Sequence, residues 1–571
     1  MSLKYIVWLG IHHRVDASPT PAFPTTFDRL DALLAAELAW TTFSPRYFHW
    51  RPNRFDSLMH AAYDGFVQLC DSQYTILLIN LPSVLSGRLN TIWHNVNFPT
   101  KVTRMIGWTE YRVEAENQLL IFESNVAIGP KAAMLRLRWI FDAEREHPLT
   151  RHAQITPEDL LAQSSFAPIR SFLNEYSISG ETLLIEVDFV DSNSNGQGAR
   201  MCIVAWNWIE GKIVARLVFP TRSNGPDHYH RLSWGTLGSS TLVVALYEAQ
   251  RTKSDALTLR VYDLSRRNDD KDSFFEPLLL REFLIPTFGG GHVDFLQLVT
   301  GDAPGASPVA DQLRSFIPEE ALGVLSKDSK PFLHPGDKED KLCVISVRTS
   351  THDDIPSLYT FVFFAQTLFA HYDSPTMSWD AWGTKHAACL FDTASTVDEI
   401  GIATFGARLA RTRTVPFARK GQKVGETAEE KEGIVQLFDF NQLRARRLSR
   451  EGSWPDISAI STALPTHPAI DALRQGIEVS EPRLMHGSHH CDDLSRSGVD
   501  SSGRELELVG LDFTVVEMRS LVWNKTELIG VHIDSEHIVV ASRLGEMKFL
   551  GQVSRLKHER HAAEGTRPQV T

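Results

Sequence analysis

The densest group of metal-capable side chains in the sequence lies in the stretch Met485–Asp493, which reads MHGSHHCDD. Imidazole and thiolate groups are zinc ligands, and the carboxylates that follow could complete a zinc or iron site. The candidate ligands are His486, His490 and Cys491. The stretch has no second ligand pair at zinc-finger spacing and matches no hydrolase motif. We therefore interpret it as a polar loop, and a metal-dependent enzyme built on it is our least favoured hypothesis.

Four other segments bear histidine or glycine residues that could carry chemistry, but their surroundings favour turns and loops. The glycines 289–291 before His292 could cradle a phosphate only if a helix followed them directly. The next residues, HVDFLQLV, predict a strand instead. The other three segments are interpreted as turn or loop residues: His12-His13, Asp227–His230 and His352–Asp354. The motifs of nucleophile elbows, zinc proteases, P-loops and paired C-x-x-C sites are missing. We accordingly expect no catalytic, cofactor-binding or metal-binding residue and no enzymatic activity.

Composition and charge bound the class of protein. The 571 residues, 43% of them hydrophobic, are enough to bury a large core. The 58 basic and 70 acidic residues give a net charge of −12, which argues against a nucleic-acid-binding surface. Because no run approaches the roughly 20 apolar residues of a membrane span, we expect no membrane partner. The odd, widely spaced cysteines predict reduced, buried thiols in an intracellular protein, cytoplasmic or nuclear: Cys70, Cys202, Cys343, Cys389 and Cys491.

The elements that would position any site are mostly short strands. The clearest is Ala199–Pro220, in which two apolar, β-branched runs flank a connection at Glu210-Gly211 and so predict a β-hairpin. Looser echoes of this pattern recur along the chain, the last at Ile538–Leu550, and a further strand is expected at Leu521–Ile529. Many short antiparallel strands with few helices between them favour a mainly β fold, because a ring of blades disposes of the strand edges. We predict a β-propeller of about six to eight blades.

Large aromatic residues support the same prediction. Trp206 and Tyr262 lie 56 residues apart, which suits one blade plus a longer loop. Trp206 and Trp208 are expected to face the same side of one strand, and Trp379 and Trp382 to flank a turn. We interpret all of these rings as packing between blades.

Helical spacing is confined to short segments. In Phe27–Trp40 the apolar residues recur at helical spacing, with Thr26 as the expected N-cap: Phe27, Leu30, Leu33, Leu34 and Leu38. If this apolar face is exposed it favours docking to a partner, and if it is buried the helix covers the propeller. A second, short helix is expected in Thr156–Leu173, where Thr156 would be the N-cap.

These patterns divide the chain into four parts. Residues 1–26 are expected to be irregular, residues 27–52 to form the amphipathic helix and an aromatic connector, residues 53–554 to form the propeller, and residues 555–571 to be a flexible tail. Within the propeller, three stretches are expected to be surface excursions: 301–341, 411–433 and 451–504.

Several motifs, in their order along the chain, resemble the F-box proteins of mushroom-forming (basidiomycete) fungi, whose C-terminal part is a divergent β-propeller-like domain. Val204–Gly211, VAWNWIEG, is similar to the family's V-W-N-W-x-x-G hairpin, and Trp379–Gly383, WDAWG, to its W-x-x-W-G-P turn, with Thr384 in place of proline. Weaker similarities are found at Asp28–Trp40, Ile79–Ser83 and Ile529–Val539. The resemblance implies a non-enzymatic substrate receptor of a cullin–RING ubiquitin ligase that binds a protein target through its propeller loops.

The ligase-docking part of such a receptor departs from the pattern. An F-box is a three-helix segment of about 45 residues that opens with Leu-Pro-x-Glu and binds the small ligase adaptor. Only 26 residues precede Phe27 and they lack that pattern, although Met1–Leu9 could be the last helix of a truncated copy. The alternatives are therefore a receptor that still binds the adaptor and a propeller scaffold that acts without a ligase.

Overall fold

The computed structural model describes the chain in separate segments, and the elements below lie within them. The described residues are 3–11, 14–16, 23–42, 47–51, 59–63, 66–70, 75–80, 92–97, 111–114, 117–125, 133–140, 142–156, 159–160, 166–167, 173–191, 199–220, 228–250, 256–267, 276–286, 292–301, 313, 332–333, 341–350, 357–370, 374–393, 401–416, 431–441, 483–487, 513–520, 528–533, 537–542 and 547–551.

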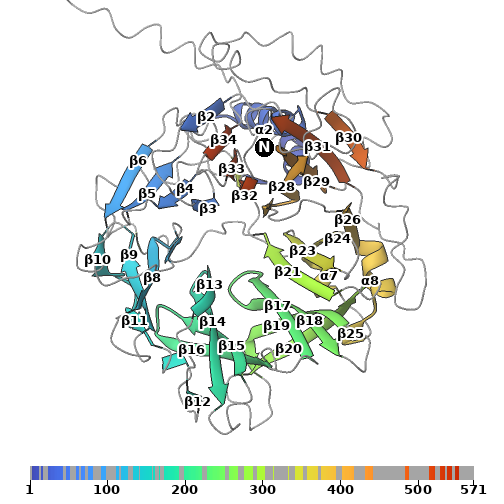
Figure 1. Cartoon of the computed structure of the whole chain (residues 1–571). Helices are drawn as coiled ribbons and strands as arrows, with labels where there is room; N and C mark the ends of the chain where they lie inside the picture. The colour runs from blue at the N-terminus through green and yellow to red at the C-terminus, as the bar shows by residue number, and fades with distance from the viewer. Residues whose placement is uncertain are drawn as a thin grey trace, which may run out of the picture.

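Apart from the two-stranded pair of β1 and β22, the described strands form seven sheets of four or five strands that follow one another around a ring (Figure 1). Each sheet is one blade of a β-propeller, and its strands run antiparallel from the centre outwards, mostly in chain order. The predicted fold class is confirmed, and the seven blades lie within the expected range. Blade 1 consists of β3 (Met59–Tyr63), β4 (Phe66–Cys70), β5 (Thr75–Asn80) and β6 (Ile92–Asn97), and blade 2 of β7 (Tyr111–Glu114), β8 (Leu119–Asn125), β9 (Ala133–Trp139) and β10 (Asp142–Glu146). Blade 3 consists of β13 (Leu173–Ser179), β14 (Thr182–Asp191), β15 (Ala199–Asn207) and β16 (Lys212–Pro220), and blade 4 of β17 (His228–Thr236), β18 (Thr241–Gln250), β19 (Ala256–Arg267) and β20 (Pro277–Ile285).

The remaining blades contain longer connections. Trp206 and Tyr262 lie on β15 and β19, the third strands of consecutive blades, so their spacing does reflect one blade repeat. Blade 5 consists of β21 (His292–Thr300), β23 (Leu342–Ser350), β24 (Ser357–Phe364) and β26 (Ala387–Thr393). Blade 6 consists of β27 (Ile402–Phe405), β28 (Arg408–Pro416), β29 (Lys431–Asp439) and β31 (Phe513–Ser520). Blade 7 consists of β32 (Leu528–Ile533), β33 (His537–Ser542), β34 (Met547–Gly551) and β2 (Tyr47–Arg51).

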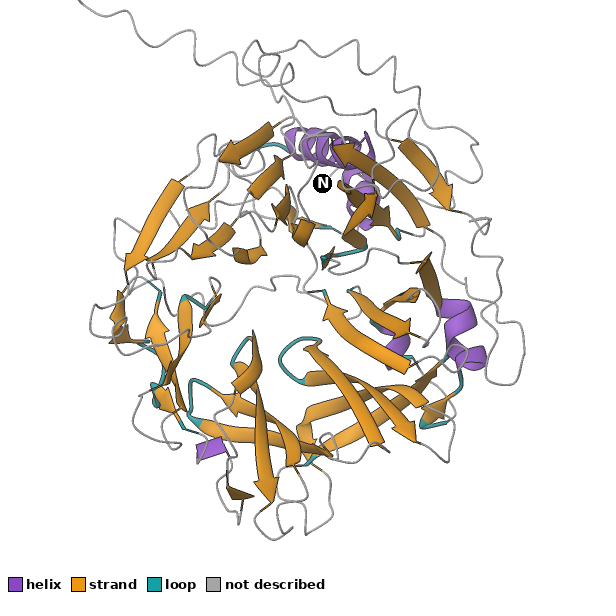
Figure 2. Ribbon diagram, in the orientation of Figure 1, coloured by secondary structure: helices purple, strands orange, loops and turns teal. Residues whose placement is uncertain are grey.

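Short strands and a few helices complete the described elements (Figure 2). None of the helices in the described segments is both long and apolar enough to cross a membrane. The short strands are β1 (Val15–Asp16) paired with β22 (Phe332–Leu333), β11 (Gln154–Ile155) on β9, β12 (Phe166–Ala167) on β14, β25 (Thr376–Met377) on β20, and β30 (Arg483–Gly487) on β31. The helices are α1 (Leu3–Ile11), α2 (Thr26–Thr42), α7 (Gln366–Phe369) and α8 (Trp379–His386).

The ring is closed by pairing the two ends of the chain. Strand β2 pairs antiparallel with β34, with Tyr47 opposite Gly551 and Arg51 opposite Met547. Strand β2 completes the last blade, and closure of the ring covers the two blade faces that an open array would expose. We had expected residues 41–52 to be only a connector, and that expectation is wrong at β2. The sequence YFHWR has the aromatic content of a strand, but its partner lies about 500 residues away in the chain.

A turn with a left-handed residue recurs between the first and second strands of a blade. The face of the ring on which these turns lie is called the turn face below. A left-handed φ is most easily adopted by glycine, which has no Cβ atom, and three of the four residues are glycines. The residues and their φ values are Gln118 (52°), Gly180 (58°), Gly238 (69°) and Gly406 (57°). In blade 5 residues 301–341 replace this turn. One residue per blade is too little for a visible sequence repeat.

The predicted hairpin Ala199–Pro220 is confirmed as β15 and β16. Its turn is closed by the side chain of Asn207, whose Oδ1 accepts hydrogen bonds from the backbone N–H groups of Ile209 (3.1 Å) and Glu210 (2.8 Å). Gly211 follows with φ of 69° and donates its N–H to the carbonyl of Asn207 at 2.8 Å. Asparagine and glycine are the residue types that such a turn requires.

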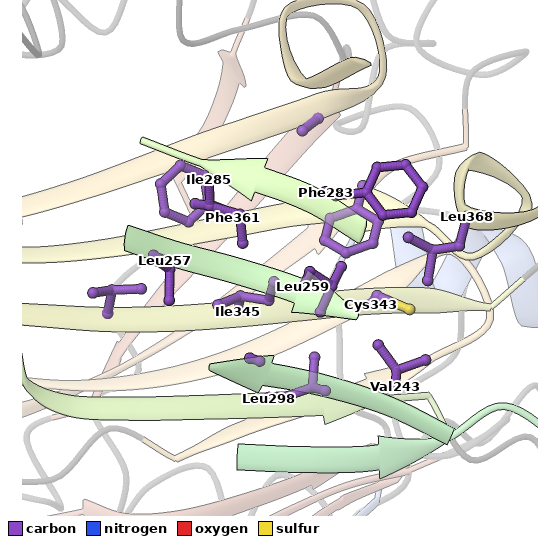
Figure 3. Close-up of a cluster of buried hydrophobic side chains, with 14 of the residues drawn as sticks. Val243, Leu257, Leu259, Phe283, Ile285, Leu298, Cys343, Ile345, Phe361 and Leu368 are labelled. Carbon is purple, nitrogen blue, oxygen red and sulfur yellow. The ribbon is translucent and has the colours of Figure 1, made fainter. Parts of the chain in front are cut away.

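The largest apolar cluster lies between blades 4 and 5 (Figure 3). Facing sheets of neighbouring blades bury alternate side chains of each strand, which stabilises the ring in the same way as the core of a sandwich. Blade 4 contributes among others Val243, Leu257, Leu259, Phe283 and Ile285, blade 5 contributes Leu298, Cys343, Ile345 and Phe361, and α7 contributes Leu368.

The motif WDAWG forms the start of α8 rather than a turn. Trp379 and Trp382 are three residues apart, so a helix places both indoles on one side. Both are buried, with ring centroids 5.1 Å apart. The indole N–H of Trp382 donates to the carbonyl of Leu284 in blade 4 at 3.1 Å. The expectation of packing between blades is confirmed, and the expectation of a turn is wrong.

Described strands occur inside all three expected excursions. Residues 301–341 include β22, residues 451–504 include β30, and residues 411–433 overlap the ends of β28 and β29. The sequence predicts a surface excursion at Arg411–Gly433. Instead Arg411 is buried, with its guanidinium 5.3 Å from the ring of Phe438 and two hydrogen bonds to Gln436. An arginine can be buried when its charge is shared with an aromatic face and an amide oxygen.

Two further expectations fall partly outside the described segments. The expected helix of Thr156–Leu173 is described only at residues 159 and 160, and β12 follows at 166–167. Thr156 does act as its N-cap, because its Oγ1 accepts the N–H of Asp159 at 3.2 Å. The strand predicted at Leu521–Ile529 is described only from Leu528, where β32 begins.

Candidate functional site

The N-terminal unit, defined here as α1, β1 and α2, consists of the described elements that precede β2. We had expected residues 1–26 to be irregular, but they contain α1 and β1. Helix α1 covers most of Met1–Leu9, the stretch that could be the last helix of a truncated F-box. The two helices pack on each other through Tyr5, Leu9, Phe23, Leu30, Ala32, Leu33 and Ala36.

Helix α2 begins at a capping box. The N–H of Asp28 donates to Thr25 Oγ1 at 3.1 Å, and the N–H of Thr25 donates to Asp28 Oδ2 at 3.1 Å. These two bonds satisfy backbone donors that would otherwise have no partner at the start of the helix. The N-cap is therefore Thr25, not Thr26 as we expected. The carboxylate lies three residues after Thr25, which is the spacing a capping box requires.

Trp40 near the end of α2 anchors the unit to the ring. Its indole is buried in the apolar cluster between blades 6 and 7, together with Phe405, Val435 and Ile533 among others. The guanidinium of Arg408 lies 4.8 Å from the centre of the indole, a cation–π distance. Phe405 and Arg408 flank the left-handed turn of blade 6, so α2 is attached on the turn face.

The apolar face of α2 is buried rather than free. Leu30 and Leu33 pack on α1, and Trp40 packs on the ring. Phe27 is an exception at 67% exposure, so its expected place in the apolar face is wrong. By the criterion set above, α2 covers the propeller and does not dock a partner through this face.

Helix α1 is apolar on two sides, of which only one is buried. Tyr5 and Leu9 face α2. Leu3, Ile6 and Val7, at spacings of three and four residues, form a second stripe with exposed fractions of 76%, 48% and 50%. A helix that is apolar all round is normally buried, and exposed apolar residues grouped on one helix indicate a binding surface. The spacing of this stripe was readable in the sequence, but which side would be covered was not.

A polar cluster joins the three elements of the N-terminal unit. The hydroxyl of Tyr5 on α1 donates to Asp16 Oδ1 on β1 at 2.7 Å. Arg29 on α2 places its Nε atom 3.2 Å from the same oxygen. The guanidinium of Arg29 also lies 5.5 Å from the ring of Tyr5. Burial, reinforced by the bond to Asp16, raises the pKa of Tyr5 well above its usual range, so the phenol remains a neutral donor.

His147 is a buried histidine whose role is structural. Its Nδ1 accepts the N–H of Leu149 at 3.3 Å, so its Nε2 carries the proton and donates to the carbonyl of Asn117 at 3.0 Å. Its ring lies edge-on to Trp208, with centroids 4.9 Å apart. Burial lowers the pKa of His147 to about 4. The neutral imidazole of His147 thus contacts both blade 2 and blade 3.

Of the three weighed metal ligands, the described segments contain His486 alone. His486 lies on β30, whereas His490 and Cys491 are outside the described residues. Among the described residues there is no group of three or more His, Cys, Asp or Glu side chains that could hold a metal. Of the other segments, His228 to His230 begin β17 and His292 begins β21, so Asp227–His230 is not a loop throughout. His12-His13, the glycines 289–291 and His352–Asp354 lie outside the described residues.

The predicted packing roles of cysteine and tryptophan are largely as expected. Cys202, Cys343 and Cys389 are buried, unpaired thiols, and burial raises the pKa of each. Trp206 and Trp208 are buried in the same cluster between blades 2 and 3. Trp208 lies in the turn after β15 and donates its indole N–H to the carbonyl of Gly180 at 2.9 Å, so the expectation that both lie on one strand is wrong.

Comparison with known proteins gives no family assignment. No protein-family model and no curated protein sequence matches the chain. The chain is similar to the WD40 domain of SCAP from fission yeast at 8% identity and a TM-score of 0.30, with 89% of this chain and 98% of that chain covered. It is similar to BamB from Moraxella catarrhalis at 7% identity and a TM-score of 0.30, covering 89% and 99%. Drosophila Semaphorin 1a, extracellular domains 1-2, gives 7% identity and a TM-score of 0.37, covering 90% of each chain.

Proposed function

We propose that the chain is a non-enzymatic protein-interaction protein that resembles the substrate-recognition part of an F-box subunit of a cullin–RING ubiquitin ligase. The closed seven-bladed ring provides a rigid support whose loops bind a protein target. Helix α1 supplies the contact to the ligase adaptor. In this proposal no side chain of the chain is catalytic, because the ligation chemistry belongs to other subunits.

The observation that carries the proposal is the exposed stripe of Leu3, Ile6 and Val7. Each of these side chains loses favourable burial, on the order of 1 to 2 kcal/mol, while it remains in water. A partner that covers the stripe recovers that free energy. The position of α1 at the expected remnant of an F-box makes the adaptor the partner to test first.

A pull-down of the full chain with the purified ligase adaptor tests the proposal. The variant carries Leu3→Ser, Ile6→Ser and Val7→Ser, which removes the apolar stripe and leaves Tyr5 and Leu9 against α2. The matched control is Val218→Ser, because Val218 is 42% exposed on the outer strand of blade 3, remote from α1 in the fold. We expect the wild type and the control to bind and the triple variant to lose binding. Absence of binding by the wild type, or unchanged binding by the triple variant, refutes docking through α1.

The alternative is a propeller scaffold that acts without a ligase. It is favoured by the burial of Leu30, Leu33 and Trp40, which makes α2 part of the folded body rather than an adaptor-binding helix. The same pull-down separates the two proposals. A chain extended upstream by any in-frame helices distinguishes a truncated receptor, which would bind the adaptor only in the longer form, from a scaffold, which would bind it in neither form.

A further inference from the structure

We propose that Asp16 is the positioning residue that holds α1 on α2 and thereby presents Leu3, Ile6 and Val7 outward. This inference rests on the proposed function of α1 as the docking helix. Asp16 does not touch the partner in this proposal. It acts through Tyr5 and Arg29.

Asp16 is placed to join all three elements of the N-terminal unit. It accepts a hydrogen bond from Tyr5 of α1 at 2.7 Å, and Arg29 of α2 lies 3.2 Å from the same carboxylate oxygen. A second guanidinium nitrogen of Arg29 donates to the other oxygen at 3.5 Å. One carboxylate therefore ties the two helices together.

Burial makes this tie difficult to replace. Tyr5 is fully buried, and the side chain of Arg29 is 6% exposed against 18% for Asp16. Water cannot readily take over the role of the carboxylate in such a setting. Removing its charge leaves a buried guanidinium without its counter-ion, which costs more than the loss of a surface pair.

The backbone of Asp16 is fixed as well as its side chain. In the pairing of β1 with β22, Val15 lies opposite Leu333 and Asp16 opposite Phe332. This strand pairing joins the unit to the connection between β21 and β23 of blade 5. Trp40 holds the other end of α2 independently of Asp16. The unit thus has an apolar anchor at the end of α2 and a polar tie near its start, and this tie acts together with the apolar contacts of Tyr5 and Leu9 to orient α1.

Asp16→Asn in the full chain tests the inference, because asparagine keeps the shape and removes the charge. Hydrogen exchange is measured over residues 3–11 and 23–42 and over the strands of blades 3 to 5. We expect exchange in α1 to accelerate about tenfold or more, consistent with the loss of a charge-assisted bond, while the blades remain unchanged. Asp31→Asn is the matched control, since Asp31 is an exposed carboxylate on α2.

A second variant and a second readout keep the test independent of folding. Tyr5→Phe keeps the ion pair with Arg29 and is expected to accelerate exchange in α1 less than Asp16→Asn. In the adaptor pull-down, Asp16→Asn should weaken binding about tenfold although the apolar stripe is intact. The inference is overturned if Asp16→Asn leaves hydrogen exchange in α1 unchanged. It is also overturned if Asp16→Asn accelerates exchange in α1 but the variant binds the adaptor as well as the wild type does. If the wild type does not bind the adaptor, the proposed function fails, and the exchange result still decides whether Asp16 holds α1.

Discussion

Lowering the pH should destabilise the folded propeller through protonation of His147 more than through protonation of any exposed histidine. The folded chain keeps the imidazole of His147 neutral, because burial lowers its pKa from 6.5 to about 4. In the unfolded chain the imidazole takes up a proton below its ordinary value of about 6.5. The unfolded state therefore binds more protons between these two values, and the free energy of unfolding falls as the pH falls through this window.

The magnitude follows from the shift. A difference of about 2.5 pH units corresponds to about 3 kcal/mol once the pH is well below 4. Between pH 7 and pH 5 the loss is about 2 kcal/mol, because most of the unfolded population is already protonated there and the folded one is not. The protonated ring would also present an N–H at Nδ1 to the N–H of Leu149, which now donates to that atom.

Urea denaturation followed by tryptophan fluorescence provides the assay, since Trp208 lies beside the imidazole. His147→Gln keeps a donor for the carbonyl of Asn117 and removes the titration. His152→Gln on the same turn is the control, because His152 is exposed. We expect wild type and the control to lose about 2 kcal/mol more than His147→Gln between pH 7 and pH 5. An equal pH dependence in all three proteins would refute the argument that burial keeps His147 neutral.

Three further predictions concern packing, turns and thiols. Trp40→Ala should cost about 3 to 5 kcal/mol by removing a buried indole and its contact with Arg408, and equal melting temperatures for variant and wild type would contradict this. Gly238→Ala should cost about 1 kcal/mol for its φ of 69° alone, since no atom lies within 4 Å of the added Cβ. Gly211→Ala has the same φ but places a Cβ 1.9 Å from the ring of His152, so its melting temperature should fall further. The thiols of Cys202, Cys343 and Cys389 should react with iodoacetamide only as fast as the chain unfolds, and rapid labelling of native protein, resolved by mass spectrometry, would show that they are accessible.

The sequence by itself determined the type of fold and the local elements. Short β-branched and aromatic runs separated by turn residues are enough to predict antiparallel strands, because this pattern depends on neighbouring residues alone. The hairpin Ala199–Pro220, the N-cap Thr156 and the helix α2 are confirmed for that reason. The number of blades, seven, lies within the predicted range of about six to eight. The prediction succeeded because a closed array of blades accommodates so many short strands.

Only the tertiary structure decided how distant segments meet. Strand β2 becomes part of the last blade because β34 offers it an open edge, and no local pattern names that partner. Arg411 is buried because Phe438 and Gln436 contact its guanidinium, although Thr412 and Arg413 follow it in the sequence. The same reason applies to α1: it is apolar on two sides, and packing on α2 covers one of them and leaves Leu3, Ile6 and Val7 exposed. Periodicity is a property of neighbouring residues, whereas burial depends on partners that the chain brings together only when it folds.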